Sequence, residues 1–314
     1  MNFRILVPLA AISIAILVYL LTPTAALYQF ILNTERSLAG LELKKIEIDQ
    51  LEIEYLRGGK GPVLILLHGF GANKDNWNKL SGHLVEQFDV IAIDVPGFGN
   101  STKDFELDYD VLSQVDRVKR FTEALNLDQF SLAGSSMGGY IAGNFAARYP
   151  LLVDNLWLIS PFGVRTTQLS DMFAATKNGE QPAVLPRNET EFMNLFTFLF
   201  VEPPFIPSPI LRHLASEAKA SADLNSKIFQ QIHRMKEGEP NPDMPLDSVL
   251  REYEGQVLIT WGGKDRVLHV SGAKVLKKTL PHAELDINEN VGHLPILEIP
   301  SKTAETFISF YKEF

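Results

Sequence analysis

The sequence predicts an α/β fold with a mostly parallel central sheet flanked by helices and a helical cap inserted between two of the strands. Two observations carry this prediction. Short apolar runs alternate with helix-like stretches along most of the chain, and a repeated order of strand, helix and strand specifies a parallel sheet. A single long stretch, 161–253, breaks this alternation and contains helical patches without a convincing strand.

The strands are predicted from the spacing of apolar residues. Residues 44–57 alternate on a period of two and indicate a hairpin of two strands. Residues 62–68 are continuously apolar, which is typical of a central strand buried on both faces. The other expected strands lie at 90–94, 131–134, 155–160, 256–262 and 283–288, and helices are expected at 111–126 and 139–149.

The predicted cap, at about 165–250, would cover the edge of the sheet where ligands bind in open α/β folds. Its most apolar part places Phe192, Phe196 and Phe200 four residues apart, on one face of a helix that a group of prolines then ends. Two roles remain open for this face. The face attaches the cap to the body, or part of it lines an acyl pocket or touches lipid, and both roles can hold together.

The first 45 residues are expected to lie outside the globular domain of residues 46–314. Residues 5–21 are apolar except for Ser13, which suits a short membrane span better than a signal peptide. Residues 26–43 mix apolar and polar positions, as in a helix on a membrane surface. We therefore expect a membrane-anchored protein, with cleavage and secretion as the alternative. The early Arg4 favours a body on the periplasmic or other extracytoplasmic side.

Composition excludes several classes of function. The net charge of −9 and the absence of a dense basic run argue against nucleic acid as a partner. Since the chain has no cysteine, it has no disulfide, no thiolate metal site and no cysteine nucleophile. None of the seven histidines belongs to a known metal-binding pattern, so neither a metal nor another cofactor is expected.

The glycine-rich stretch LAGSSMGGYIAG, 132–143, contains the candidate nucleophile. The pattern Gly-x-Ser-x-Gly is met only with Ser136 at its centre, flanked by Gly134 and Gly138. It follows an apolar strand and precedes a helix, which is the context of a nucleophile elbow. A phosphate-binding loop is excluded because the lysine that it requires does not follow. The remaining glycines, Gly139 and Gly143, are expected to permit close packing of this helix on the sheet.

A serine nucleophile needs a base and an acid that orients the base. Folds with such an elbow carry them in the order serine, acid, histidine. Asp265 in WGGKDRV and His293 in ENVGHLP occupy the expected places, each after a strand and beside glycines. Three other acids near strand ends are weaker candidates, namely Asp94, Asp154 and Asp286.

Stabilisation of an oxyanion requires N–H donors beside the serine. The backbone amide of Met137, at the start of the helix, is the first expected donor. The second is expected from the loop HGFGANKDNW, 68–77, where two glycines allow the backbone to turn inward and present the amide of Phe70. His68 is interpreted as a brace for this loop rather than as a reacting group.

Together, HGFG, DVPGFGNS, GSSMGG, WGGKDRV and VGHLP make the chain resemble the α/β-hydrolase family over residues 45–314. The longer motifs and the apolar N-terminus are similar to those of membrane-anchored monoacylglycerol lipases and bacterial lipases. This resemblance implies a carboxylester hydrolase that acts on lipid esters through Ser136, Asp265 and His293. The alternatives are a hydrolase of carbon–carbon bonds in vinylogous diketones, or a member of the fold without catalytic activity.

Overall fold

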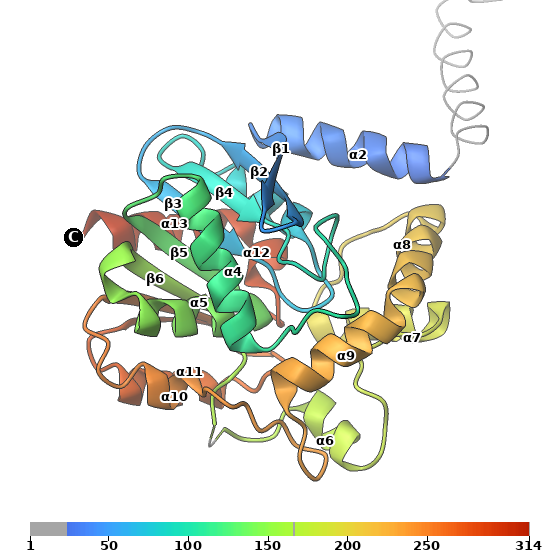
Figure 1. Ribbon diagram of the computed structural model, residues 1–314. Coiled ribbons are helices and arrows are strands. Elements are labelled where there is room, and N and C mark those ends of the chain that lie inside the picture. Colours follow the sequence, from blue (N-terminus) through green and yellow to red (C-terminus); the bar gives the residue numbers. More distant parts are fainter. Residues whose placement is uncertain (1–23, 166, 314) are drawn as a thin grey trace, which may run out of the picture.

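The computed structural model describes residues 24–165 and 167–313. Within these residues, the centre of the molecule is an eight-stranded sheet in the order β1-β2-β4-β3-β5-β6-β7-β8 (Figure 1). From β4 to β8 all neighbouring strands run parallel, whereas β2 joins β1 and β4 in the antiparallel sense. The strands are β1 (Glu42–Ile48), β2 (Leu51–Gly58), β3 (Val63–Leu67), β4 (Asp89–Ile93), β5 (Phe130–Ser135), β6 (Val153–Ile159), β7 (Gln256–Gly262) and β8 (Glu284–Asn288). The predicted fold class is confirmed.

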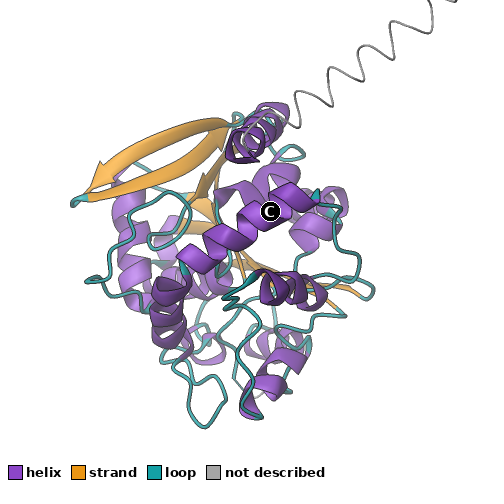
Figure 2. Ribbon diagram, turned by 90° about the vertical axis from the view of Figure 1, so that its right-hand side faces the viewer, coloured by secondary structure: helices purple, strands orange, loops and turns teal. Residues whose placement is uncertain are grey.

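The first two strands form the predicted hairpin, paired from Glu42 opposite Arg57 to Ile48 opposite Leu51. Its turn consists of Asp49 and Gln50, which have φ values of 49° and 70°. Figure 2 shows this hairpin as the long pair of strands that extends away from the rest of the sheet.

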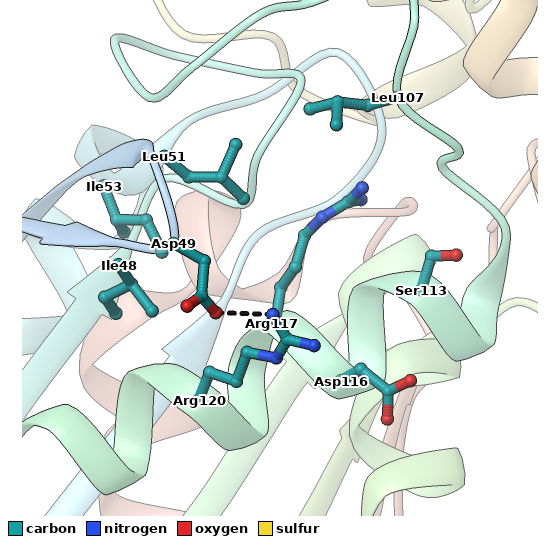
Figure 3. A pocket seen from close by; sticks show the side chains of 9 residues that line it. All are labelled: Ile48, Asp49, Leu51, Ile53, Leu107, Ser113, Asp116, Arg117 and Arg120. Atoms are coloured by element: carbon teal, nitrogen blue, oxygen red, sulfur yellow. Dashed lines mark hydrogen bonds and ion pairs between the residues drawn. The ribbon is translucent and has the colours of Figure 1, made fainter.

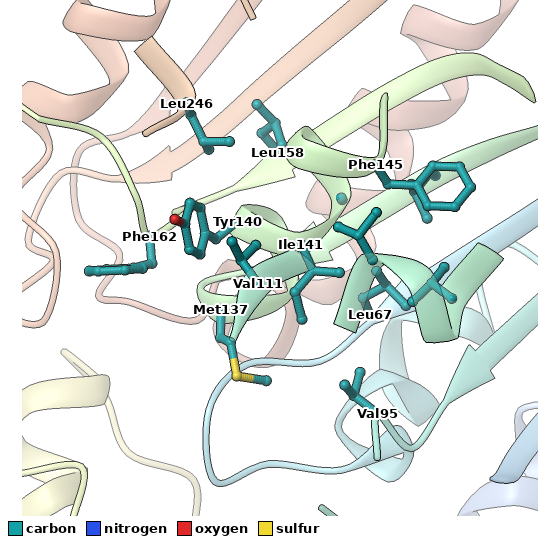
Figure 4. Close-up of a cluster of buried hydrophobic side chains, with 14 of the residues drawn as sticks. Leu67, Val95, Val111, Met137, Tyr140, Ile141, Phe145, Leu158, Phe162 and Leu246 are labelled. Carbon is teal, nitrogen blue, oxygen red and sulfur yellow. The ribbon is translucent and has the colours of Figure 1, made fainter. Parts of the chain in front are cut away.

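Two apolar cores cover the two faces of the sheet because side chains of a strand point alternately to opposite sides. In β3, Ile65 and Leu67 belong to one core, and Leu64 and Leu66 belong to the other. The first core, part of which Figure 4 shows, includes side chains from α4 (Val111–Ala124), α5 (Met137–Arg148) and α11 (Ser271–Thr279). The second core is covered by α3 (Asn78–Ser81), α12 (Pro295–Glu298) and α13 (Pro300–Lys312).

The predicted helical insertion lies between β6 and β7. Among its described residues the backbone forms helices and one isolated bridge, between Lys236 and Glu239, but no strand. Figure 1 shows α6 to α9 gathered beside one end of the sheet. The helices are α6 (Asp171–Lys177), α7 (Glu189–Leu199), α8 (Ser208–Ala220), α9 (Ala222–His233) and α10 (Leu246–Val249).

One packing prediction is corrected here. Gly143 was expected to permit close contact between its helix and the sheet, but a Cβ there would lie 2.5 Å from Cδ2 of Leu246 in α10. For Gly139 the prediction is confirmed, because a Cβ there would lie 3.0 Å from Gly134 O in β5, besides 2.8 Å from the Cβ of Pro161 just after β6. Gly143 instead makes room for α10 of the insertion.

The helix α2 (Thr24–Leu38) precedes the hairpin and contacts both the body and the insertion. Its Tyr28 ring lies edge-on to His213 of α8, with 5.2 Å between ring centroids. Nearer its end, Leu32 and Arg36 are buried. None of the helices in the described ranges is long and apolar enough to cross a bilayer, and the anchor predicted at 5–21 lies outside those ranges.

Candidate active site

Ser136 stands at the junction between β5 and α5 with a left-handed backbone, φ 55° and ψ −116°. A residue with a side chain rarely adopts such angles and does so only where surrounding contacts enforce them. Here its N–H donates to Ile159 O at 3.0 Å, and its carbonyl accepts from Tyr140 N at 3.1 Å and Phe162 N at 3.0 Å. These three bonds hold the turn from β5 into α5 against the end of β6 and against the first turn of α5.

The flanking glycines are required by close backbone approaches. A Cβ on Gly134 would lie 2.1 Å from Gly138 O, and one on Gly138 would lie 2.0 Å from Leu67 O. Neither position can hold a side chain without moving the backbone. The neighbouring loop also passes close to the serine, because a Cβ on Gly69 would lie 3.3 Å from the Ser136 Cβ.

The structure brings Asp265 and His293 together, although they lie 28 residues apart in the sequence. His293 Nδ1 is 2.7 Å from Asp265 Oδ2, and both side chains are buried. Because a carboxylate accepts hydrogen bonds but does not donate them, this contact places a proton on Nδ1, so that in the neutral imidazole Nε2 carries the free lone pair. The geometry gives His293 the tautomer that a general base requires.

Asp265 is itself held by its surroundings. Its Oδ1 accepts from the backbone of Val267 and Leu268, both at 2.9 Å, and its Oδ2 also accepts from Trp261 Nε1 at 3.1 Å. The loops that follow β7 and β8 are in direct contact, since a Cβ on Gly262 would lie 1.8 Å from Gly292 O. The carboxylate therefore has a fixed orientation toward the imidazole.

Ser136 directly follows β5, whereas Asp265 and His293 follow β7 and β8 of the same sheet. Among the hydrogen bonds of the described residues, none joins its Oγ to His293, whose side chain is bound to Asp265. Without substrate, such contacts in an active site are often longer than a hydrogen bond. Ser136 is partly accessible, whereas its neighbour Ser135 is buried with an unpaired Oγ.

The two expected oxyanion donors belong to segments that adjoin Ser136, since Met137 follows it in the chain and Phe70 follows Gly69, where a Cβ would lie 3.3 Å from the Ser136 Cβ. No hydrogen bond within the described chain uses the backbone N–H of Phe70 or of Met137, so both groups are available to a ligand. The Phe70 ring packs against Phe98, Phe229 and His233, with centroid distances of 5.4, 5.8 and 6.0 Å. The loop after β3 is thus in contact with α9 of the insertion.

His68 has the bracing contacts expected of it. Its Nε2 accepts from Val95 N at 3.0 Å, and its Nδ1 lies 2.7 Å from Gly69 O. Burial lowers the pKa of this imidazole below its usual range. His68 therefore joins the loop after β3 to the one after β4.

The three weaker acid candidates occupy other environments. Asp94 is buried and accepts from Lys74 Nζ at 2.8 Å. Asp286 accepts from Asn288 at 2.9 Å, and Asp154 is exposed. The partnership of Asp94 and Lys74 was not predicted, because an isolated lysine in a polar loop gives no sequence signal of burial.

The three phenylalanines assigned to a substrate pocket form a continuous row. Ring centroids are 5.5 Å apart between Phe192 and Phe196, and 5.7 Å apart between Phe196 and Phe200. The row ends near His293, because the backbone N–H of His293 donates to Leu199 O at 2.8 Å. Their role in substrate binding stays a prediction.

A small cavity lies next to a residue that contacts Asp265. It has a volume of about 40 Å³, and its walls include Phe162, Phe173 and Trp261, the last of which donates to Asp265. A separate groove of about 270 Å³ lies between the β1–β2 hairpin and α4 (Figure 3). An ion pair between Asp49 and Arg120 crosses one end of it. None of the predicted site residues lines this groove, which is lined by Ile48, Asp49, Leu51, Ile53, Leu107, Ser113, Asp116, Arg117 and Arg120.

No cluster of three or more potential metal ligands occurs in the described ranges.

Residues 62–300 match the family model of the alpha/beta hydrolase fold. The chain belongs to the alpha/beta hydrolase family. Two curated members are similar over most of their length. Lipase 1 of Psychrobacter immobilis is 30% identical over 90% of this chain and 88% of that protein. Monoacylglycerol lipase ABHD6 of Mus musculus is 28% identical over 93% of this chain and 88% of that protein.

A solved alpha/beta hydrolase structure is also similar. It is that of a membrane phospholipase A, described as a bacterial virulence factor. The TM-score is 0.88, the sequences are 37% identical, and the match covers 99% of both chains. Taken with the curated relatives, these findings make this alpha/beta hydrolase an enzyme of the lipase and esterase type, which acts on ester bonds.

Proposed function

We propose that this enzyme hydrolyses lipid esters of the acylglycerol class through an acyl-enzyme on Ser136. The observation that carries the proposal is the Asp265–His293 pair, 2.7 Å apart, on loops at the same sheet edge as the strained serine. A serine hydroxyl reacts only with a base that takes its proton, and an aligned carboxylate stabilises the imidazolium that forms.

The proposed reaction has two halves. His293 takes the proton of Ser136 as Oγ attacks the ester carbonyl, and the Phe70 and Met137 amides donate to the oxyanion. His293 then protonates the departing alcohol, which breaks the carbon–oxygen bond and leaves the acyl group on Ser136. Water repeats these steps, releases the fatty acid and restores the serine. One oxyanion donor contributes about 3 kcal/mol to such a transition state.

The substrate class rests on the relatives and on the insertion. Proteins similar over most of the chain are named as lipases, monoacylglycerol lipases and a membrane phospholipase A. The row of Phe192, Phe196 and Phe200 offers an apolar surface near His293, which suits an acyl chain. We assign these side chains to the acyl-binding surface of a cap at about 165–250, within a catalytic domain that was predicted at 46–314 and whose sheet starts at Glu42.

We further propose that the apolar segment within residues 1–45 anchors this domain to a membrane, with its body on the extracytoplasmic side; α2 and the start of β1 pack on the domain and are not part of that anchor. The support is the apolar sequence at 5–21 and the membrane phospholipase A that matches 99% of the chain. Mass spectrometry of the purified protein would detect an intact first residue. A mature chain that begins after residue 26 would instead indicate a cleaved signal.

Two adjacent serines provide a matched test. Ser136→Ala should reduce hydrolysis of p-nitrophenyl butyrate and of monoacylglycerol by roughly a thousandfold or more and abolish labelling by a fluorophosphonate. Ser135→Ala removes a buried hydroxyl with no hydrogen-bond partner and should leave both readouts intact. Labelling that persists in Ser136→Ala would overturn the proposed mechanism. Initial rates on esters of increasing chain length would separate a lipase from an esterase of short soluble substrates.

A further inference from the structure

Glu298, the last residue of α12, binds two segments that are distant in the sequence. Its Oε1 accepts from Gly292 N at 2.7 Å, next to the catalytic histidine. Its Oε2 accepts from Val201 N at 3.0 Å and Glu202 N at 3.3 Å, just after α7. One carboxylate therefore joins the histidine loop to the end of a cap helix.

The two segments also bind each other directly. The His293 N–H donates to Leu199 O at 2.8 Å. Gly292 is required at this contact, because a Cβ there would lie 2.6 Å from Leu199 O and 2.9 Å from Glu298 Oε1. His293 is thus restrained through its side chain by Asp265 and through its backbone by α7 and Glu298.

The acid loop is attached to the same helix turn. Arg266 follows Asp265, and its Nη1 donates to Thr197 O at 3.0 Å while its guanidinium carbon lies 4.7 Å from the centre of the Phe198 ring. The last carbonyls of a helix have no partner inside the helix. In α7, Thr197 O and Leu199 O find their partners on the loops that carry Asp265 and His293.

Glu298 itself sits on a rigid base. Its N–H donates to Leu294 O at 3.0 Å within α12. The neighbouring Ile296 is buried in the second core together with side chains of α3 and α13. The carboxylate therefore extends from the packed body of the domain, while the segment it holds belongs to the insertion.

We propose that Glu298 is a positioning residue, whose carboxylate clamps the end of α7 to the His293 loop and so sets the place of the base and of the cap together. This inference rests on the proposed function, since it assigns His293 as the base. The charge is needed because a carboxylate accepts on both oxygens. A glutamine has only one acceptor oxygen, so its amide group would face an N–H on the other side.

Glu298→Gln is the informative variant because it keeps the volume and breaks one side of the clamp. We expect kcat for p-nitrophenyl butyrate to fall roughly tenfold to a hundredfold with KM nearly unchanged, since misplacing a catalytic group by about 1 Å has this effect. The rate of fluorophosphonate labelling of Ser136 should fall in parallel. The far-downfield NMR resonance expected of the His293 Nδ1 proton, which is bound to Asp265, should broaden or disappear.

The matched control is Glu202→Gln. It removes a nearby exposed carboxylate but keeps the backbone N–H that Glu298 binds. This control should retain wild-type kcat and the downfield resonance. If Glu298→Gln has the same kcat, labelling rate and resonance as Glu202→Gln, the inference is wrong.

Gly292→Ala keeps the proposal testable if Glu298→Gln folds poorly. Its methyl group would lie 2.6 Å from Leu199 O and 2.9 Å from Glu298 Oε1, so it disturbs both contacts and should also lower kcat with KM nearly unchanged. A folded Gly292→Ala with wild-type kcat would contradict the clamp. Ser136→Ala distinguishes failure of the proposed function from failure of the clamp. Activity that survives in Ser136→Ala refutes the proposed function. An inactive Ser136→Ala together with a fully active Glu298→Gln refutes only the clamp.

Discussion

Arg36 of α2 and Asp75 of the loop after β3 form a two-pronged buried ion pair. Arg36 Nε lies 2.6 Å from Oδ1, and Nη2 lies 2.7 Å from Oδ2. This geometry matches the planar guanidinium to the planar carboxylate and is the strongest form of such a pair. It attaches the helix that follows the predicted anchor to the loop that carries the expected oxyanion donor Phe70.

The pair is part of a larger buried cluster. Lys74 Nζ lies 2.7 Å from Glu54, 2.8 Å from Asp94 and 3.7 Å from Asp75. Burial would raise the pKa of Glu54, but hydrogen bonds from Lys74 and Asn100 outweigh it and lower that pKa below its usual value. Two buried cations, Arg36 and Lys74, thus neutralise most of the charge of three carboxylates, so the cluster tolerates loss of a carboxylate better than loss of a buried cation.

The first prediction compares Arg36→Leu with Asp75→Asn. Arg36→Leu leaves Lys74 as the buried cation among three buried carboxylates, with the half-exposed Lys45 3.7 Å from Glu54, and should lower the free energy of unfolding by about 3 kcal/mol or more. Asp75→Asn leaves two cations with two carboxylates and should cost less. Urea unfolding followed by circular dichroism measures both. Equal losses, or a larger loss in Asp75→Asn, would contradict this account of the cluster.

The second prediction concerns His233, which is buried at the end of α9. Its ring lies 3.9 Å from the Phe229 centroid and 4.3 Å from that of Phe162. Burial lowers its pKa from 6.5 to about 3. Below pH 6.5 the unfolded chain therefore binds a proton that the folded protein does not, so this residue reduces stability as the pH falls from 6.5 toward 3.

The expected contribution is about 1.4 kcal/mol for each pH unit in that window. His233→Phe keeps an aromatic ring and removes the titrating group, so its free energy of unfolding should fall less steeply with decreasing pH than that of the wild type. The control is His282→Gln, which replaces an exposed imidazole. Curves of wild type and His233→Phe that stay parallel from pH 6.5 to 4 would show that His233 does not titrate in this way.

The third prediction tests the contact between α5 and α10. Gly143→Ala gains about 1 kcal/mol of helix propensity, but its Cβ would lie 2.5 Å from Leu246 Cδ2, so the single variant should be destabilised. Leu246→Ala alone should cost about 2 to 5 kcal/mol because it leaves a buried cavity. In that background Gly143→Ala should become stabilising. The same sign in both backgrounds would show that the two positions do not interact.

The fourth prediction concerns the phenylalanine row of α7. Phe196→Ala removes the middle ring, so kcat/KM for long-chain esters should fall roughly tenfold relative to butyrate, as expected for about 1.4 kcal/mol of lost apolar contact. Phe205→Ala, which removes a ring that is 91% exposed, is the control. An unchanged ratio of long-chain to short-chain rates in Phe196→Ala would assign the row to packing alone.

The sequence determined those features that are written in local patterns. Apolar runs and their spacing predicted the parallel sheet, the hairpin and the strand-free insertion, because the period of side-chain burial differs between strands and helices. The turn at Ser136 was likewise predictable, since its backbone excludes side chains at Gly134 and Gly138. The order of the short motifs along the chain identified the family, because each motif is a local run of residues.

Only the tertiary structure decided which distant residues meet. The Arg36–Asp75 pair joins positions 39 residues apart, and the Glu298–Val201 contact spans 97. A lone charged residue in a loop is ordinarily solvated, so nothing in the sequence distinguishes it from one that folding will bury. The close contact of Gly143 was assigned to the sheet rather than to Leu246, because the sequence does not show which element packs on that face of the helix. Such contacts depend on how the insertion packs on the body, and that packing is set by shape and burial over the whole domain rather than by any local run of residues.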